Sequence, residues 1–580
     1  MKNILEYLET TAKRFPDKPA FVCGEESVTF GQLRRRAASY GRNIAARTGN
    51  RTGRPVCVVG EREIDALVCM LACVYSGNYY VPVDSALPQA RIAGMLETVD
   101  FLGVICVSGQ RFEAEKLAFS DVYVEDIKPS ETVLPGAGHA GAGDTASESN
   151  AGSPDGRDGA GHAGAGDTAP ENTAAEHRDT VRPDAAGTKA GRPDAASRNT
   201  GFPEPGESDG DLDRFIAGTI SHSRSFDPLY GIFTSGSTGV PRLVVKSHGA
   251  LISFVDTFVE MFGFTQDDVL GNQFAFYFDA STKDLFACLK CGLTVHIIPK
   301  VFFSFPQKLV PYLMEHQITK IIWVPSALVL VANADSLETI GVPGALEDIF
   351  FVGEQMPVRQ LNYWKAHLPQ ARFVNIYGST ETAGNFLFHV YDEILPDDAR
   401  LPTGRPFPNT KVFLLDEKGR EVTETGEEGE ICVVSETLSQ GYYGCPEMTN
   451  AVFVQNPLVP YREVMYRTGD LASYDEDGNI VWQSRRDFQI KHMGYRIELS
   501  EIEVVIGAIP QIEECCCVYD GAAQKILLYY QAKEDLKKVI GKQVREKLPK
   551  YMFPSKYVKI EQIPHNANGK IDRRKLASLS

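Results

Sequence analysis

The sequence lacks the charge balance of a nucleic-acid-binding protein. Its 580 residues carry 59 Lys and Arg against 76 Asp and Glu, a formal net charge of −17. Because nucleic-acid binders usually present a basic face, no nucleic-acid partner is expected. The sequence also lacks a run of about eighteen uncharged apolar residues, and residues 1–8 predict an amphipathic helix rather than a signal peptide. We therefore expect a cytoplasmic protein with no membrane span.

Cysteines are few, and they are not spaced as a metal site. Several of the 12 lie inside apolar runs, and residues 515–517 are three consecutive cysteines, which favours a strand over a disulfide framework. Cys288 and Cys291 form a single C-x-x-C with no second pair at zinc spacing. We interpret them as small buried side chains, with a metal or redox role as the minor alternative.

The order of apolar runs predicts an α/β fold. Strand-like runs at 56–59, 295–298 and 321–324 alternate with helical patterns such as residues 30–46, which is typical of largely parallel sheets. Near residue 485 the elements become shorter and more charged. A strand signal at 526–531 and a helix signal at 536–548 then predict a small α+β domain.

One segment, at about 129–213, differs from the rest in composition. It is rich in Gly, Ala, Asp, Ser, Thr, Pro and Arg, and it repeats GAGHAGAGDTA at 136–146 and 159–169. Such a segment has too little apolar surface to offset the entropy of ordering it. We predict a disordered insertion between two parts of the large domain.

The strongest local signal is that of a phosphate-binding loop. Residues 232–242 run from Ile-Phe into six consecutive small or hydroxylated residues, Thr234 to Gly239. Glycines let the backbone approach an anion, and hydroxyl and backbone N–H groups donate hydrogen bonds to phosphate oxygens. The spacing is not that of a Walker loop, and a surface loop is the alternative.

Three further segments suit a nucleotide. Residues 375–382 combine an aromatic ring, hydroxyls and a carboxylate, which suit a base, a phosphate and Mg²⁺. Residues 466–470 end in Asp470, a carboxylate suited to paired ribose hydroxyls, and Lys570 follows a turn-forming Asn-Gly. Singly, Tyr377 fits a core, Asp470 a turn and Lys570 a solvated surface. Together they favour a nucleotide site.

In their order along the chain, these motifs resemble those of the adenylate-forming superfamily, which includes peptide-synthetase adenylation domains, D-alanine–carrier-protein ligases, acyl-CoA synthetases and firefly luciferase. Residues 71–84 are similar to its "aGxxYvPiD" segment, and residues 484–498 to its hinge and the following loop. The resemblance covers essentially the whole chain outside the insertion. It implies a large adenylation domain of stacked, largely parallel sheets at 1–486 and a small mobile C-terminal domain at 487–580.

The resemblance also implies a role for each matching residue. The loop that binds the phosphates of ATP corresponds to Thr234, Ser235, Gly236, Ser237, Thr238 and Gly239. Tyr377, with Gly378, corresponds to the residue that stacks on adenine, and Asn375 to the one that hydrogen-bonds its amino group. Thr380 corresponds to a phosphate contact, and Asp470 and Arg485 to the pair that binds ribose. Glu381 corresponds to a Mg²⁺ ligand, Asp487 to the hinge of the small domain, and Lys570 to the lysine that stabilises negative charge during adenylation.

The acyl site is indicated by residues 276–286, which resemble the peptide-synthetase segment "FDaSxxxxf". Its Asp, here Asp279, pairs with the substrate α-ammonium, which supplies the cation that a buried carboxylate needs. The alternative is that Asp279 caps the following helix. Alignment to the peptide-synthetase pocket gives as lining residues Asp279, Ala280, Lys283, Trp323, Phe350, Val352, Ile376, Gly384 and Asn385.

Lys283 is the charged exception among the bulky or apolar pocket positions that follow Asp279. A lysine there needs an anion or must reach solvent. It therefore either pairs with an acidic substrate side chain or extends out of the pocket, while Trp323 narrows the pocket for a small substrate such as alanine.

The resemblance implies an ATP- and Mg²⁺-dependent ligase. It would activate an amino acid as the aminoacyl-adenylate with release of pyrophosphate, and transfer it to the phosphopantetheine thiol of a separate carrier protein. The overall likeness to D-alanine–carrier-protein ligases favours a small substrate such as D-alanine. The alternatives are a carboxylate–CoA ligase and a nucleotide-binding scaffold without activity.

Overall fold

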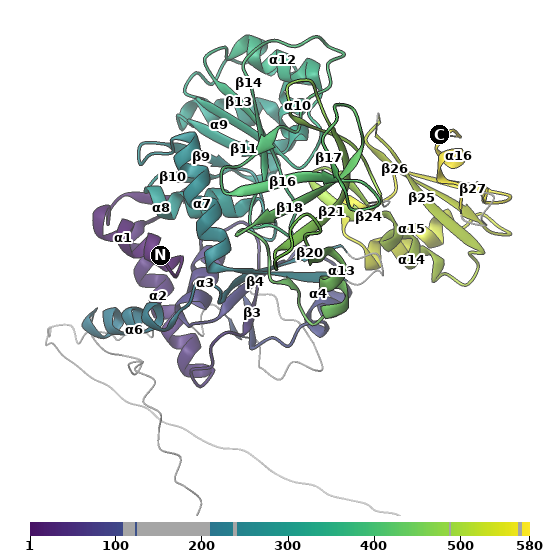
Figure 1. Ribbon diagram of the computed structural model, residues 1–580. Coiled ribbons are helices and arrows are strands. Elements are labelled where there is room, and N and C mark those ends of the chain that lie inside the picture. Colours follow the sequence, from purple (N-terminus) through teal and green to yellow (C-terminus); the bar gives the residue numbers. More distant parts are fainter. Residues whose placement is uncertain are drawn as a thin grey trace, which may run out of the picture. The chain divides into compact units, whose positions relative to one another are not determined.

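The computed structural model describes most of the chain outside the predicted insertion. The described residues are 1–107, 122–123, 209–235, 241–486, 489–521, 523–565 and 571–579. They belong to one compact unit that spans Met1–Pro129 and Thr200–Ser580 (Figure 1). No helix in this described part is long and apolar enough to cross a membrane.

The largest sheet of the described residues has nine strands and is parallel through its centre. Its edges are antiparallel, at the pairs β1–β2, β13–β14 and β14–β15. The strand order is β15 (Arg405–Pro406), β14 (Leu387–Tyr391), β13 (Arg372–Tyr377), β12 (Asp348–Val352), β11 (Lys320–Trp323), β9 (Val269–Asn272), β10 (Thr294–Ile297), β1 (Pro19–Cys23) and β2 (Glu26–Thr29).

A second sheet, of seven strands, is also parallel apart from one end, where β8 pairs antiparallel with β7 and β19. The strand order is β19 (Gly441–Tyr442), β8 (Arg242–Ser247), β7 (Pro228–Thr234), β4 (Tyr79–Asp84), β3 (Pro55–Gly60), β5 (Gly103–Cys106) and β6 (Val122–Tyr123). The predicted α/β class with stacked, largely parallel sheets is confirmed.

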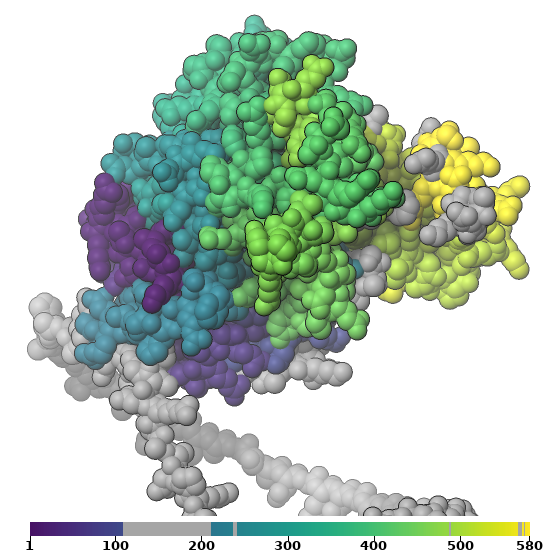
Figure 2. All heavy atoms as spheres, in the orientation of Figure 1, coloured from purple at the N-terminus to yellow at the C-terminus, as the bar shows by residue number. Residues whose placement is uncertain are grey.

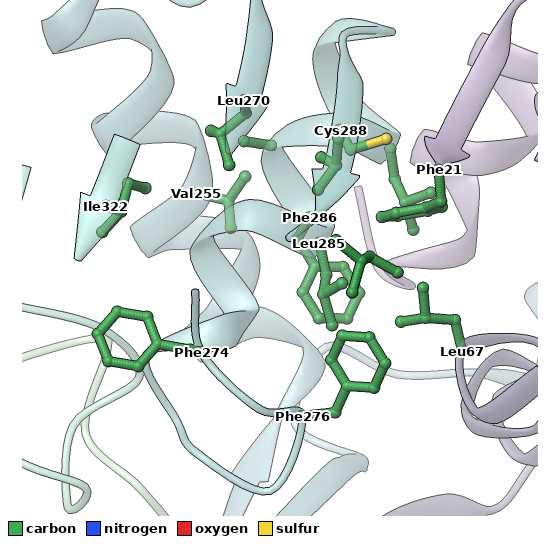
Figure 3. Close-up of a cluster of buried hydrophobic side chains, with 14 of the residues drawn as sticks. Phe21, Leu67, Val255, Leu270, Phe274, Phe276, Leu285, Phe286, Cys288 and Ile322 are labelled. Carbon is green, nitrogen blue, oxygen red and sulfur yellow. The ribbon is translucent and has the colours of Figure 1, made fainter. Parts of the chain in front are cut away.

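The helix α3 (Ile64–Tyr75) lies between these two sheets. It contacts β3 and β4 of the seven-stranded sheet and β1 and β2 of the nine-stranded one. Nearly every residue from Ile64 to Tyr75 is buried, as expected of a helix that is apolar on all sides. Figure 3 shows how Leu67 of this helix faces Phe21 of β1 and Leu285 of the helix α8 (Ser281–Cys291).

The remaining helices of the large domain cover the outer faces and edges of the sheets. In the space-filling view the purple N-terminal residues border the blue segment that carries α7 and α8 (Figure 2), and the Thr11 hydroxyl donates to the Leu289 carbonyl at 2.7 Å. These helices are α1 (Leu5–Arg14), α2 (Phe30–Arg47), α4 (Gln89–Glu97), α6 (Asp209–His222), α7 (His248–Phe262), η1 (Lys300–Ser304), α9 (Pro306–Glu315), α10 (Pro325–Asn333), α11 (Ser336–Thr339), α12 (Val358–His367) and α13 (Pro446–Val452).

A third sheet of the described residues is antiparallel, which the sequence patterns did not predict. Three of its pairs, β16–β17, β20–β21 and β21–β22, join consecutive strands, whereas β18 pairs with the more distant β21. The sheet contacts the edge of the nine-stranded sheet through β16 and β15. The strand order is β17 (Glu421–Val422), β16 (Thr410–Leu415), β18 (Gly429–Ser435), β21 (Val464–Tyr474) and β20 (Phe453–Gln455), with β22 (Ile480–Arg485) on β21.

The C-terminal part contains the predicted α+β elements. Its apolar core joins the three-stranded sheet to two helices. The elements are β23 (Gln489–His492), β24 (Tyr495–Glu498), α14 (Leu499–Gly507), β25 (Glu514–Asp520), β26 (Lys525–Gln531), α15 (Lys537–Lys547), η2 (Lys550–Met552), β27 (Lys556–Ile560) and α16 (Arg573–Ala577). The boundary at 486/487 stays a prediction, since residues 487–488 lie outside the described ranges.

The predicted end of the insertion, at about residue 213, falls within a helix. The helix α6 begins at Asp209, Leu212 is buried, and Asp213 forms an ion pair with Arg34 of α2. The apolar residues Leu212, Phe215 and Ile216 give this segment a helical pattern that its polar neighbours conceal. The rest of the predicted insertion, from residue 129 to residue 208, lies outside the described residues.

Candidate functional site

A cleft forms where the strands of both parallel sheets end. Loops at the carboxyl ends of parallel strands are the usual place for a ligand site in α/β sheets. The lining includes the end of β7 (Thr234 and Ser235), the segment that leads into α8, the loops after β12 and β13, the β21–β22 pair, and the β23–β24 hairpin with Gly494, Tyr495 and Arg496.

The predicted ribose-binding pair is brought together by strand pairing. Asp470 of β21 lies opposite Arg485 of β22, and Arg485 Nη1 lies 2.9 Å from Asp470 Oδ1. The indole N–H of Trp482 donates to the same oxygen at 3.0 Å, and the Tyr377 hydroxyl donates to Oδ2. Both residues of the pair line the cleft. Tyr377 is thereby linked to the pair, although the two segments are 93 residues apart.

The predicted adenine-binding residues lie on β13, next to the cleft. Gly378 and Thr380 line it, whereas Asn375 donates to the Pro402 carbonyl at 3.3 Å and is not among the lining residues described. Lys491 Nζ lies over the Tyr377 ring, 4.6 Å from its centroid. Burial lowers the pKa of Lys491. An adenine stacked on that face of Tyr377 would replace Lys491.

Only the start of the predicted phosphate loop is described. Thr234 Oγ1 lies 3.4 Å from the Arg242 carbonyl oxygen, and the Ser235 hydroxyl donates to the Arg496 carbonyl at 2.9 Å. Gly236, Ser237, Thr238 and Gly239 lie outside the described residues.

Glu381, the predicted Mg²⁺ ligand, is buried in an ion pair. Its Oε2 lies 2.7 Å from Arg496 Nη1, and its Oε1 accepts a hydrogen bond from Tyr442 at 2.8 Å. Burial would raise the pKa of the Glu381 carboxyl, but the Arg496 charge and these hydrogen bonds lower it to about 2. Because Arg496 neutralises its charge and Glu381 is not among the lining residues described, Glu381 does not fit a Mg²⁺ ion at the cleft in this arrangement.

On the acyl side, Asp279 precedes α8 and lines the cleft. The alternative that the Asp279 side chain caps α8 is wrong. The N-cap residue is Ala280, and it is the main-chain carbonyl of Asp279 that accepts from the Thr282 N–H at 3.1 Å. The Asp279 carboxylate instead accepts hydrogen bonds from the Tyr230 hydroxyl and the Lys246 ammonium, each at 2.8 Å. The cation that the sequence argument assigned to the substrate is thus already supplied by the chain.

Lys283 does not extend to solvent, so that part of the sequence prediction is wrong. It is 2% exposed, lines the cleft and lies one turn after Asp279. Burial, opposed by the charges of Asp279 and Asp284, lowers the pKa of Lys283 to about 8. Its nearest described ring is Phe254, whose centroid lies 5.9 Å from Nζ.

The other predicted pocket positions divide into lining and core residues. Ala280, Val352, Gly384 and Asn385 line the cleft. Trp323 is fully buried in the nine-stranded sheet, where its indole N–H donates to the Gly271 carbonyl at 2.8 Å, and it is not among the lining residues described. The structure therefore does not bring Trp323, Phe350 or Ile376 to the cleft.

Asp487 and Lys570 lie outside the described residues. Of the residues that flank Lys570, His565 lies 2.9 Å from Glu514 of β25, and Ile571 packs on the apolar face of the same small sheet. Neither of these flanking residues lines the cleft.

Sequence reasoning missed the cations that complete the site. Lys246 ends the apolar run 243–245 within β8, and a lysine closing a buried strand was a signal for it. Arg496 and Lys491 lie in the segment whose resemblance was noted, but no role was assigned to either.

The comparisons with known proteins agree with this geometry. The model of the AMP-binding enzyme family matches residues 8–443, and that of the AMP-binding enzyme C-terminal domain matches residues 501–570. The chain is 29% identical over 588 residues to a D-alanine–D-alanyl carrier protein ligase of Bacillus licheniformis, covering 99% of each. It is 29% identical over 585 residues to an L-proline–[L-prolyl-carrier protein] ligase of Streptomyces coelicolor, covering 99% of this chain and 96% of that protein.

Solved structures agree as well. The crystal structure of IdnL1 superposes with a TM-score of 0.71 at 25% identity, covering 97% of this chain and 99% of that one. The resemblance to adenylate-forming enzymes is thus confirmed. Because the first family model matches well over half of the residues, the chain belongs to the AMP-binding enzyme family.

Proposed function

We propose that the protein is an ATP-dependent ligase that activates an amino acid as its aminoacyl-adenylate and transfers it to the phosphopantetheine thiol of a separate carrier protein. The observation that carries this proposal is that one cleft holds both the Asp470–Arg485 pair, suited to ribose, and the Asp279 carboxylate, suited to an α-ammonium. Two similar proteins are named as amino acid–carrier protein ligases.

In the first half-reaction the amino-acid carboxylate attacks the α-phosphorus of ATP, a P–O bond forms, and pyrophosphate leaves. Attack of one anion on another requires cations close to the developing charge. Of the described cations at the cleft, Arg485, Lys491 and Arg496 suit a triphosphate. Lys570 is proposed as the cation that acts in the transition state. Mg²⁺ is proposed as well, but no step is assigned to it through Glu381 in this arrangement.

The second half-reaction requires a thiol to reach the adenylate. In this structure the β23–β24 hairpin forms part of the cleft wall: the Gly494 N–H donates to Glu354 at 2.7 Å, and Arg496 pairs with Glu381. These contacts cross between the large domain and the C-terminal part. We propose that rotation about Asp487 exchanges this hairpin for Lys570, which separates the two half-reactions in time.

The test is amino-acid-dependent ATP–pyrophosphate exchange with the purified chain. A panel of twenty amino acids is compared with simple carboxylates, and the adenylate is then offered to a phosphopantetheinylated carrier protein or to coenzyme A. We expect exchange with an amino acid and transfer to the carrier. Exchange with no amino acid contradicts the proposal, and transfer to coenzyme A alone makes the protein a carboxylate–CoA ligase. A cytoplasmic location remains a prediction.

A further inference from the structure

Lys246 is a buried ammonium group that holds one oxygen of the acyl-site carboxylate. Its side chain is 0% exposed, and Nζ donates to Asp279 Oδ1 at 2.8 Å and to the Thr382 carbonyl at 2.9 Å. Tyr230, its partner in the β7–β8 register, donates to the same Oδ1 at 2.8 Å. Among the described residues, nothing donates a hydrogen bond to Oδ2 of Asp279. One carboxylate oxygen is therefore fixed, and the other is free to receive a substrate group.

Lys283 is a second ammonium on the same side of the cleft, and it is not paired. It follows Asp279 by four residues, it is 2% exposed, and it lines the cleft. Within the described part of the chain, Nζ has no hydrogen-bond or ion-pair partner. Asp284, its neighbour in sequence, accepts a hydrogen bond from Asn272 at 2.5 Å and does not line the cleft.

The charges of this side of the cleft decide what it accepts. Lys246 already neutralises Asp279, and the charge of Lys283 is offset only in part by Asp284, because burial raises the pKa of the Asp284 carboxyl to about 7. An amino acid with an uncharged side chain would bring a further ammonium and no anion except the reacting carboxylate. Burying an unpaired charge is costly, and a substrate anion at Lys283 would remove that cost.

We propose that the acyl side of the cleft selects an amino acid whose side chain ends in a carboxylate. Lys283 binds that carboxylate, and Lys246 positions Asp279 so that Oδ2 receives the α-ammonium. The proposal rests on the amino-acid activation proposed above and narrows its substrate class. It differs from the alanine and proline of the two similar ligases, whose names state their substrates.

The first experiment compares glutamate, aspartate and alanine as D- and L-forms in ATP–pyrophosphate exchange. For the unmodified protein, kcat/KM for one acidic amino acid should exceed that for alanine by at least about 30-fold, the lower limit expected for a buried charge pair. A preference for alanine overturns the inference while leaving amino-acid activation intact. No exchange with any amino acid overturns the proposed function instead.

A variant pair locates the selectivity. Lys283→Met should lower kcat/KM for the acidic substrate by about 30-fold or more and leave alanine within about threefold. The matched control is Lys290→Met, because Lys290 lies on the same helix, pairs with Asp256 and does not line the cleft. Equal losses for both substrates in Lys283→Met would contradict the role assigned to Lys283.

Lys246 is tested as a positioning residue by the ratio of kcat/KM for an amino acid to kcat/KM for the same acid without its α-ammonium. A general loss of structure would lower both values and leave their ratio unchanged. Glutamate is compared with glutarate, or aspartate with succinate, in which the α-ammonium is missing. Without Lys246, Asp279 relies on the substrate for its cation, so Lys246→Met should raise the preference for the amino acid by about tenfold, even if activity falls overall. If the ratio is the same in Lys246→Met and the unmodified protein, the inference is overturned. If Lys246→Met does not fold, the inference is overturned when the unmodified protein shows no preference for an acidic amino acid.

Discussion

The two sides of the cleft differ in how completely the chain pairs its own charges. On the nucleotide side, Asp470 is held by Arg485, Trp482 and Tyr377, so its carboxylate is positioned without any ligand. On the acyl side, the described residues hold Asp279 through one oxygen, and Lys283 is buried with no hydrogen-bond or ion-pair partner among them.

This difference separates what the two sides recognise. The nucleotide proposed for this site is a single compound, ATP, and a paired, rigid site suits the binding of one fixed ligand. The acyl side must discriminate among substrates, and an unpaired buried charge discriminates strongly because only a matching ion relieves its cost. The unpaired side is therefore the one that we expect to determine specificity.

The largest effect on activity is expected from Lys570, the cation proposed to act between the amino-acid carboxylate and the α-phosphate during adenylation. Lys570→Ala should lower the rate of adenylation by about 100- to 1000-fold, as for loss of one group that stabilises transition-state charge. Transfer from a supplied aminoacyl-adenylate should largely survive. Pyrophosphate exchange and single-turnover transfer measure the two steps, with Lys575→Ala on α16 as the control. Equal loss of both steps would contradict domain rotation.

A change on the nucleotide side should affect ATP alone. Asp470→Asn keeps the shape of the side chain but removes the charge that holds Arg485, so KM for ATP should rise by about 100-fold while KM for the amino acid changes little. Steady-state exchange with each substrate varied in turn gives both constants. Asp477→Asn, in an exposed turn, is the control. A parallel rise in both constants would show that the two sides are not separate.

Replacing Lys283 on the acyl side should alter how the free energy of unfolding depends on pH. Burial lowers the pKa of Lys283 from 10.5 to about 8, so between these values the unfolded chain binds more protons and stability rises with pH. Lys283→Met removes this penalty and should raise the free energy of unfolding by up to about 3 kcal/mol at pH 7.

This gain should shrink as the pH rises above about 8, because the wild-type ammonium then loses its charge. Urea unfolding at pH 7 and 9.5 measures it, and Lys290→Met should show no such dependence. A variant that is less stable than the wild type at both pH values would contradict an unpaired ammonium at this position.

The smallest effect is expected for the segment with the least apolar composition. Deleting residues 130–199 should leave adenylation within about twofold, because a polar, repetitive segment contributes little to the core. The deletion spares α6, whose Asp213 pairs with Arg34. Pyrophosphate exchange and soluble yield are the measurements. Loss of either would show that the segment contacts the folded part.

The sequence alone was enough for the class of fold, and the family resemblance implied the roles that remain predictions for the nucleotide side of the site. The helix expected at 30–46 is α2 (Phe30–Arg47), and the strand expected at 526–531 is β26 (Lys525–Gln531). These elements follow from local periodicity, which short-range sterics and burial impose. The pairing of Asp470 with Arg485 was implied by the family resemblance, and the β21–β22 register brings the two side chains together.

Only the tertiary structure decided the acyl side and the antiparallel sheet. Lys246 and Asp279 are 33 residues apart, and Arg496 and Glu381 are 115 apart, so no local pattern joins them. Whether a charge is paired depends on which side chains the fold packs against it. That depends on strand order and register, which long-range contacts set, and it explains why Lys283 was open to two interpretations until its burial was seen.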